Sequence, residues 1–262
     1  VFTDSQTIIV TVTNENDNNP VIQGDSSITL TIAENTTYVT DVDAEDNDND
    51  TLFYYILQGT DQDRFSIDAS SGVLVFDSAP DYEIPTDSDV DNTYIVIVTV
   101  SDGTNTDSQT INVIIDNRND NAPIITGGAT AIVNIDENTT SVTNIEATDI
   151  DGDILKYSLT GGVDKTKFTI DDSTGMLSFI LPPDYENPTD SNGDNNYVVV
   201  VTVSDGNSTD SQTVTVTVTN VNDRNPVIDG GNEAFVNVDE NNTFVKDINA
   251  TDGDGNTLTY SI

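Results

Sequence analysis

The chain has 262 residues, of which 35% are hydrophobic, and its 47 acidic side chains outnumber 7 basic ones, for a formal net charge of −40. Nucleic acids and anionic membranes are excluded as partners because like charges repel at close range. Cysteine and histidine are absent, which removes disulfides, the usual zinc sites and most nucleophile–base pairs, so we predict that the chain is not an enzyme. No stretch approaches the roughly 18 apolar residues of a membrane helix, so no membrane insertion is expected in this window.

Short segments of alternating or β-branched residues, separated by Gly, Asp and Asn turns, predict strands along the whole chain. No segment shows a convincing helical period. About seven short antiparallel strands in roughly 100 residues indicate an all-β, Greek-key sandwich of immunoglobulin type, without the Cys pair and Trp of antibody domains. In the first copy of the pattern the predicted strands lie near residues 28–33, 37–43, 52–57, 64–68, 72–76, 94–100 and 111–115.

Sequence motifs recur with an offset of 103 residues. The motif Thr-Asp-Ser-Gln-Thr at 3–7 returns at 106–110 and 209–213, and Asp-Tyr-Glu at 81–83 returns at 184–186. The chain begins at Val1 without a signal pattern and ends in a strand-like segment, which indicates a window from a longer protein. We therefore predict tandem sandwiches in a linear rod. The predicted units are the last strand of a preceding repeat at 1–19, whole repeats at 20–122 and 123–225, and the first strands of a following repeat at 226–262.

Many acids keep their register from copy to copy, and they fall at strand ends, turns and linkers. Each repeat has a Glu ending the first strand, an Asp-x-Asp after the second, an Asp-Tyr-Glu, a Ser-Asp-Gly after the long strand, and a linker rich in Asn and Asp. Strand ends of a sandwich gather at its two poles, so acids of successive repeats and of the linker between them can meet. Calcium takes six to eight oxygen ligands from such groups, and the cluster would otherwise repel itself.

These motifs resemble those of tandem cadherin repeats, in particular the cadherin-like repeats of large bacterial surface proteins. The family linker D-x-N-D-N-x-P resembles residues 14–20, 117–123 and 220–226. The first position of the pattern is Asn in all three linkers. In the third linker Arg224 replaces the Asn that follows the second Asp of the family pattern. That replacement puts the third site in question unless the position contributes only a backbone carbonyl. The resemblance covers the whole chain.

The resemblance implies calcium ligands position by position. For the middle junction they are Glu34, Asp81, Glu83, Asn119, Asp120, Asn121, Asp149, Asp151 and Asp205. For the first junction they are Asn16, Asp17, Asn18, Asp46, Asp48 and Asp102, and for the last they are Glu137, Asp184, Glu186, Asn222, Asp223, Asp252 and Asp254. The family binds about three calcium ions at a junction, and their charge nearly cancels that of the seven acids in the middle set.

A second group of acids lies at residues 87–92 and 190–195. Oxygen-bearing side chains occupy every other position there, which resembles the start of a calcium-binding loop. The later bidentate Glu of such loops is missing, so a polar surface turn is the other interpretation. Both interpretations stay open at this point.

The predicted function is a calcium-rigidified stalk or adhesive region of a large extracellular adhesin that attaches cells to one another or to a surface. The expected partners are the adjacent repeats of the same chain, with identical chains or a surface or glycan ligand as further candidates, and the expected location is the cell surface. Two alternatives are a structural subunit of an extracellular filament or sheath, and a spacer in a secreted polysaccharide-binding protein or enzyme.

Overall fold

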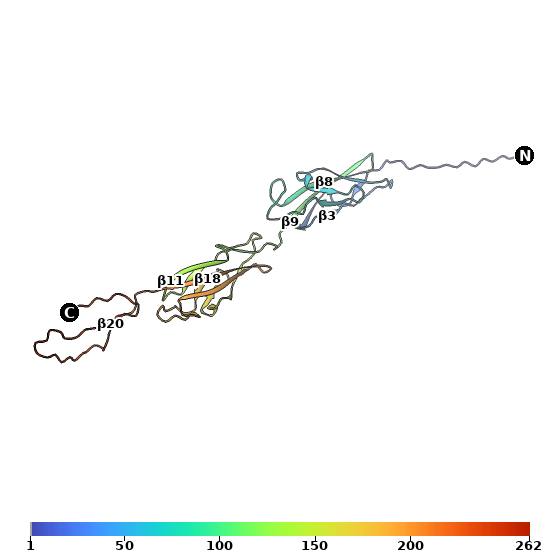
Figure 1. The fold of residues 1–262 in the computed structure, drawn as a ribbon. Helices are drawn as coiled ribbons and strands as arrows, with labels where there is room; N and C mark the ends of the chain where they lie inside the picture. The colour runs from blue at the N-terminus through green and yellow to red at the C-terminus, as the bar shows by residue number, and fades with distance from the viewer. Residues whose placement is uncertain (1) are drawn as a thin grey trace. The chain divides into compact units, whose positions relative to one another are not determined.

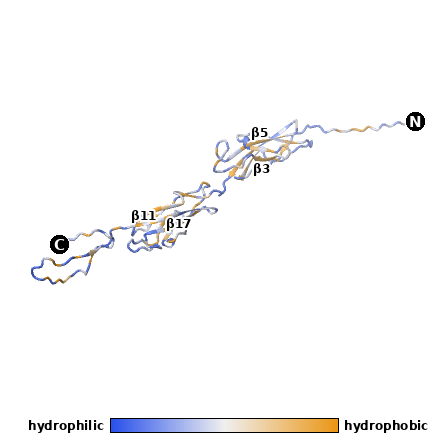
Figure 2. Cartoon of the chain, viewed as in Figure 1, coloured by the Kyte–Doolittle hydropathy of each residue, from blue (hydrophilic) through white to orange (hydrophobic). Residues whose placement is uncertain are grey.

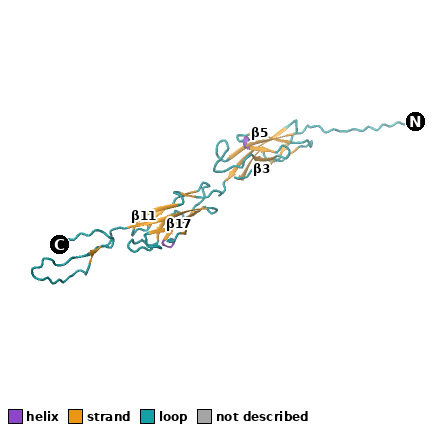
Figure 3. Ribbon diagram, viewed as in Figure 1, coloured by secondary structure: helices purple, strands orange, loops and turns teal. Residues whose placement is uncertain are grey.

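The computed structural model describes residues 2–262, and within them regular structure consists of strands and two single 3₁₀ turns, η1 (Gln62–Arg64) and η2 (Lys165–Lys167) (Figures 1 and 3). The chain divides into two compact units, Val1–Arg118 and Asn119–Ile262. Hydrophobic residues lie mainly along the strands, and hydrophilic residues lie mainly in the loops (Figure 2). Each unit is described by itself below.

The first unit contains one sandwich built from two sheets. The larger sheet has the strand order β2-β9-β8-β5 and the smaller has the order β3-β7-β6, while β1 and β4 form a separate short pair. The bounds are β1 (Val21–Ile22), β2 (Ser27–Ala33), β3 (Tyr38–Asp41), β4 (Ala44–Glu45), β5 (Phe53–Gln58), β6 (Phe65–Ile67), β7 (Val73–Phe76), β8 (Thr93–Ser101) and β9 (Thr106–Asp116).

Alternation of apolar and polar residues decides which side chains enter the core between the two sheets. Along β8, Tyr94, Val96 and Val98 are fully buried, and the residues between them are half-buried. Tyr94 packs edge-on against Phe76 of the smaller sheet, with ring centroids 5.0 Å apart. Such aromatic contacts add to the burial of apolar area, so one cluster joins the two sheets.

One feature of the sheet differs from the sequence prediction. We expected only antiparallel strands, but β2 pairs in parallel with β9, with Ile28 opposite Ile111 and Leu30 opposite Val113. Alternation shows which face of a strand is buried, and it carries no information on the direction of the partner strand. A parallel pair is possible here because the rest of the repeat serves as the long crossover connection that parallel strands require.

The second unit repeats this architecture between residues 124 and 219. Its sheets have the orders β11-β18-β17-β14 and β12-β16-β15, with β11 again parallel to β18. The predicted all-β, immunoglobulin-like sandwich is thus confirmed in both copies. The bounds are β10 (Ile124–Ile125), β11 (Thr130–Asp136), β12 (Ser141–Asn144), β13 (Ala147–Thr148), β14 (Lys156–Gly161), β15 (Phe168–Ile170), β16 (Met176–Phe179), β17 (Asn196–Ser204) and β18 (Thr209–Thr219).

The two flanking segments contain little regular structure. Residues 2–19 form no strand, although the sequence predicts one there, and Val1 lies outside the described residues. Residues 226–262 contain only the short pair β19 (Val227–Ile228) and β20 (Ala250–Thr251). A strand needs a neighbouring strand for its ladder of hydrogen bonds, and among the described residues these segments have no further partner strand.

Candidate metal centre

In the second unit, the linker is attached to the Asp-x-Asp turn that follows β13. The backbone N–H groups of Asp120 and Asn121 donate to Asp151 Oδ2 at 3.1 and 2.9 Å, and Asn121 Nδ2 donates to Asp151 Oδ1 at 2.8 Å. The N–H of Asp151 in turn donates to Asp149 Oδ1 at 3.0 Å, as Asp side chains commonly do two residues along a turn. The turn therefore fixes four of the predicted ligands close together.

The first unit contains the same arrangement 103 residues earlier. Asp17 and Asn18 donate their backbone N–H groups to Asp48 Oδ2 at 3.0 and 2.7 Å, and Asp48 donates its N–H to Asp46 Oδ1 at 2.8 Å. The linker residues and the Asp-x-Asp turn predicted for the first junction thus lie together. The recurrence shows that the motif, rather than chance, builds this pole of each sandwich.

Several side-chain oxygens at these poles are buried and accept no hydrogen bond. In the second unit they are Asn119 Oδ1, Asp149 Oδ2 and Asp205 Oδ2, and in the first unit Asn16 Oδ1 and Asp46 Oδ2 repeat the pattern. A buried acceptor without a donor is costly, more so when it is charged. A cation with oxygen ligands supplies the missing positive partner, so the residues present fit calcium.

Two further acids at these poles are crowded by the predicted ligands. Burial, followed by repulsion from Asp46, raises the pKa of Asp50, and burial followed by repulsion from Asp149 raises the pKa of Asp153. Both residues sit two positions after the Asp-x-Asp motif. Both pKa values are raised chiefly because burial disfavours the ionised form, and the neighbouring carboxylates add to this effect because a like charge disfavours it as well.

The aspartates that follow the long strands are held ionised at the same poles. Asp205 accepts the N–H groups of Asn207 and Ser208, both at 2.6 Å, and Asp102 accepts those of Thr104 and Asn105 at 2.7 and 2.6 Å. The pKa of Asp205 is lowered chiefly by the backbone bond from Ser208, and that of Asp102 chiefly by the bond from Asn105. Each carboxylate therefore keeps its charge close to the linker. The side-chain amide of Asn119 donates to the backbone carbonyl of Asp205, and that of Asn16 donates to the backbone carbonyl of Asp102.

The opposite pole of each sandwich is organised by a buried glutamate. In the first unit Glu34 follows β2, is only 2% exposed, and accepts the N–H groups of Tyr82 at 2.8 Å and Arg118 at 2.7 Å. Carboxylate oxygens of Glu34, Asp81 and Glu83 lie within 4.8 Å of one another. These three predicted ligands thus come together inside one unit.

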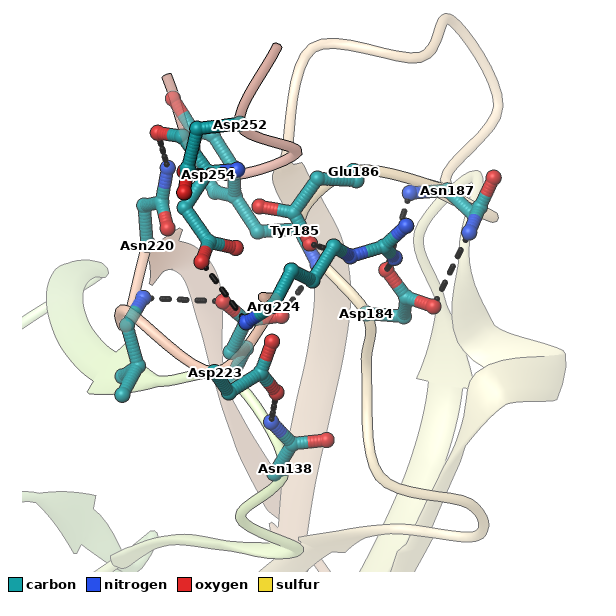
Figure 4. Close-up of polar contacts among 12 residues, drawn as sticks. Asn138, Asp184, Tyr185, Glu186, Asn187, Asn220, Asp223, Arg224, Asp252 and Asp254 are labelled. Atoms are coloured by element: carbon teal, nitrogen blue, oxygen red, sulfur yellow. Dashed lines mark hydrogen bonds and ion pairs between the residues drawn. The ribbon is translucent and has the colours of Figure 1, made fainter. Parts of the chain in front are cut away.

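In the second unit Glu186, Asp223 and Asp254 lie in a larger cluster (Figure 4), and the equivalent glutamate, Glu137, belongs to the same cluster. Glu137 is 3% exposed and accepts the N–H groups of Tyr185 and Val221, both at 2.8 Å. The acids of this cluster come from the second repeat, the third linker and the following turn. Ligand oxygens within 4.8 Å of one another come from Glu137, Glu186, Asp223 and Asp254.

Three other ligands predicted for this last junction have different surroundings. Asp252 accepts the N–H of Asp254 at 3.0 Å and so holds the turn. Asn222 is exposed. Asp184 forms an ion pair with Arg224, whose Nη2 lies 2.9 Å from Asp184 Oδ1. The pKa of Asp184 is lowered chiefly by its hydrogen bond from the side chain of Asn187, with Arg224 contributing.

The acidic loop at 87–92 has features of both interpretations. Asp87 is buried and accepts the N–H groups of Asp91 and Asn92, as in a polar turn. Carboxylates of Asp87, Asp89 and Asp91 also lie within 4.8 Å of one another, and repulsion from Asp91 is the main cause that raises the pKa of Asp89. In the second repeat Asn192 replaces the middle acid and donates to Asp194 at 2.9 Å, so the crowding is lower there.

Sequence reasoning missed one buried acid in each repeat. Asp61 is 5% exposed and Asp164 is 2% exposed, and neither lies among the predicted ligands. Asp164 accepts the N–H groups of Ser191 at 2.7 Å and Val198 at 2.8 Å, so it ties the 190–195 loop to β17. The only sequence signal for this pair is that Asp61 and Asp164 are 103 residues apart. Many other acids of the chain recur with the same offset, so this signal does not single the pair out.

The family model for the cadherin domain matches residues 28–116 and 132–219, more than half of the chain. The chain belongs to the cadherin family. Its cadherin repeats are of the kind found in extracellular ectodomains of adhesion proteins, and calcium binding is characteristic of the family. The predicted resemblance to tandem cadherin repeats, the all-β fold and the extracellular location are thereby confirmed, while the link to bacterial surface proteins stays a prediction.

Relatives of these cadherin repeats include Cadherin-23 of Mus musculus, which is 32% identical over 212 residues and matches 75% of this chain. Cadherin EGF LAG seven-pass G-type receptor 2 of Homo sapiens is 31% identical over 212 residues and matches 78% of the chain. The match spans only 6% and 7% of these two relatives, respectively. Within residues 2–262, the cadherin chain has no helix long and apolar enough to cross a membrane.

Solved cadherin structures share the fold. Mouse Cadherin-23 EC22-24 aligns with a TM-score of 0.66 at 23% identity, over 90% of this chain and 78% of that one. A fragment described as the protocadherin gammaB7 EC3-6 cis-dimer aligns with a TM-score of 0.61 at 21% identity, over 82% of this chain and 54% of that one. At this level of identity the likeness concerns the fold alone.

Proposed function

We propose that the acids at the poles of these cadherin repeats bind calcium and that the bound ions fix the relation between successive repeats. The observation that carries the proposal is the set of buried oxygens that accept no hydrogen bond, Asn16 and Asp46 in the first unit and Asn119 and Asp149 in the second. They recur at an offset of 103 residues. Hydrogen bonds within the protein leave these atoms without a positive partner, and calcium supplies one.

The chain's own residues prepare the last junction for this role. Glu137 joins the loop containing Tyr185 to the linker residue Val221 through two hydrogen bonds of 2.8 Å. Asp254 accepts the N–H of Arg224 at 2.8 Å and so joins the same linker to the following turn. Acids of three segments are thereby held within 4.8 Å of one another, where they repel strongly unless a cation lies among them.

The middle junction is proposed to work in the same way, on the basis of sequence offset. The residues equivalent to Glu137, Glu186, Asp223 and Asp254 are Glu34, Glu83, Asp120 and Asp151. Without calcium their repulsion favours separation of the repeats; with calcium their charges are compensated. Extracellular calcium modules need only weak affinity, with dissociation constants on the order of 10⁻⁴–10⁻³ M.

At the level of the whole protein, we propose a stalk or adhesive region that mediates attachment at the cell surface. Cadherin repeats are typical of adhesion proteins, which supports this role. A second copy of the chain is a candidate partner, since a protocadherin gammaB7 fragment of the same fold is described as a cis-dimer. Analytical ultracentrifugation of the chain with and without calcium tests self-association.

The first prediction concerns Asp120. The chain has no cysteine, so Gln58→Cys and Lys156→Cys, both at exposed positions, give one spin label on each sandwich. We expect the inter-label distance distribution, measured by double electron–electron resonance, to be narrow in calcium and broad with a chelator. Asp120→Ala should raise the calcium concentration at the midpoint of this change at least about tenfold, equivalent to about 1.4 kcal/mol of binding free energy.

Asp63→Ala is the matched control, because it removes an exposed acid at η1 and leaves the junction motifs unchanged. It should leave the midpoint where it is in the parent chain. Circular dichroism should show both variants to be folded. Equal calcium-dependent narrowing in Asp120→Ala and the parent would contradict the assignment of the middle junction.

A further inference from the structure

The third linker differs from the other two at a single position in its Asn-Asp-Asn motif. Asn18 and Asn121 use the side-chain amide to donate to Asp48 Oδ1 and Asp151 Oδ1 at 2.7 and 2.8 Å. Arg224 holds the equivalent place and keeps the backbone contact, with its N–H 2.8 Å from Asp254 Oδ2. The backbone contact of the third linker is therefore the same as in the other two linkers, and only the side chain at this position has different partners.

The guanidinium of Arg224 points away from the turn and toward the preceding sandwich of the same unit (Figure 4). Its Nε lies 2.9 Å from Glu186 Oε2, and its Nη2 lies 2.9 Å from Asp184 Oδ1. The side chain of Glu186 is only 13% exposed, so this positive charge is placed at a largely buried acid. Burial lowers the pKa of Arg224, but Asp184 and Glu186 outweigh it and raise the pKa, so the group stays charged.

A glycine in the following turn leaves room for this side chain. A Cβ atom at Gly253 would lie 2.4 Å from Arg224 Cδ and 3.2 Å from Arg224 Cβ, closer than atoms can approach without a shift. The equivalent positions are Asn47 and Ile150 in the repeats whose linkers carry Asn. The arginine and the glycine thus occur together, and the glycine is required by the path of the arginine.

Part of the acidic cluster remains without a positive partner. Asp254 Oδ1 is buried and accepts no hydrogen bond, because the amide that serves this atom in the other two repeats has been replaced. Asp254 lies in the cluster with Glu137 and Asp223. The arginine therefore compensates the acids on one side of the cluster and leaves the other side for a cation.

We propose that the Arg224 guanidinium is a built-in cation that takes the place of one calcium ion at the last junction, beside Asp184 and Glu186. This inference rests on the calcium-binding function proposed above. The junction then needs fewer calcium ions than its neighbours, and part of it stays paired when calcium is removed. Junctions of one chain would in this way respond to different calcium concentrations.

The test counts calcium ions bound to the whole 262-residue chain at saturation, by native mass spectrometry and by calorimetric titration. Arg224→Asn restores the residue present in the other linkers and should bind one calcium ion more per chain than the parent. Arg118→Asn is the control, since it removes the same charge from a linker and, among residues 2–262, Arg118 has no ion pair at 4.0 Å or less. Its calcium count should equal that of the parent.

A second measurement follows the arginine itself. The Nε–H resonance of Arg224 should exchange slowly with water in the parent chain, with and without calcium, because it is paired with Glu186. Gly253→Ile should abolish this protection by displacing the side chain. In the Arg224→Asn background, Gly253→Ile gives the last junction the same two residues that the middle junction has at Asn121 and Ile150. The double variant should therefore bind as many calcium ions as Arg224→Asn alone.

The outcomes separate the two proposals. If the parent binds calcium and Arg224→Asn binds the same number of ions, the built-in cation is refuted and calcium binding stands. The inference is also refuted if Arg224 Nε–H is unprotected in the parent. If neither chain binds calcium, the proposed function itself fails, and the arginine cannot replace an ion that is never bound.

Discussion

Replacing Glu137 by Ala is expected to destabilise the second sandwich by about 2–4 kcal/mol even without calcium, because the N–H groups of Tyr185 and Val221 lose their acceptor. The loss should be larger in calcium, since a ligand that binds only the folded state adds stability that grows with the logarithm of its concentration above the dissociation constant. Urea unfolding followed by NMR signals of the second sandwich, in calcium and in chelator, measures both values.

Glu146→Ala provides the matched control, because Glu146 is an exposed glutamate of the same repeat that does not belong to the predicted ligands. Its effect should stay within about 0.5 kcal/mol under both conditions. Glu34→Ala should reproduce the Glu137 result in the first sandwich, where Glu34 accepts two N–H groups in the same geometry. An equal loss of stability for Glu137→Ala with and without calcium would show that the residue is structural and not a ligand.

Replacing Asp164 by Ala is expected to cost about 2–5 kcal/mol, with no dependence on calcium. Asp164 is 2% exposed, and its two oxygens accept the N–H groups of Ser191 and Val198. Removal leaves both N–H groups without their buried acceptor and breaks the connection between the 190–195 loop and β17. The same urea unfolding experiment measures the effect, and calcium titration of the variant should give the ion count of the parent.

Asp172→Ala serves as the comparison for this variant. Asp172 is highly exposed and pairs with Lys156 at 3.5 Å, and such surface pairs contribute about 0–1 kcal/mol. Asp61→Ala should match Asp164→Ala in the first sandwich, because Asp61 accepts the N–H groups of Ser88 and Ile95. A change in calcium count on replacing Asp164 would contradict its assignment as a purely structural acid.

Features that depend on local pattern could be predicted from the sequence. The strict alternation of residues 214–219 correctly placed the valines in the core and the threonines outside it. The structure also brings Asp149 and Asp151, which the Asp-x-Asp motif singled out, together in one turn that holds the linker. Their role as calcium ligands stays a prediction.

Features that depend on direction in space could not be predicted in this way. The parallel pairing of β11 with β18 leaves no trace in the alternation of either strand. Asp164 is one acid among many in a chain of net charge −40, and its burial follows from packing that the pattern does not encode. The substitution at Arg224 was visible, but its path toward Glu186 became evident only together with Gly253.

The parallel pairing has a mechanical consequence. The first long strand of the second sandwich, β11, and its last strand, β18, run in the same direction side by side, joined over seven residue pairs. A pull on the two ends of the repeat drags these strands past each other along their length, so the rungs of the ladder are loaded in shear and must yield together. A repeat pulled at its two ends would therefore resist with the whole β11–β18 ladder at once, rather than with one hydrogen-bonded pair at a time.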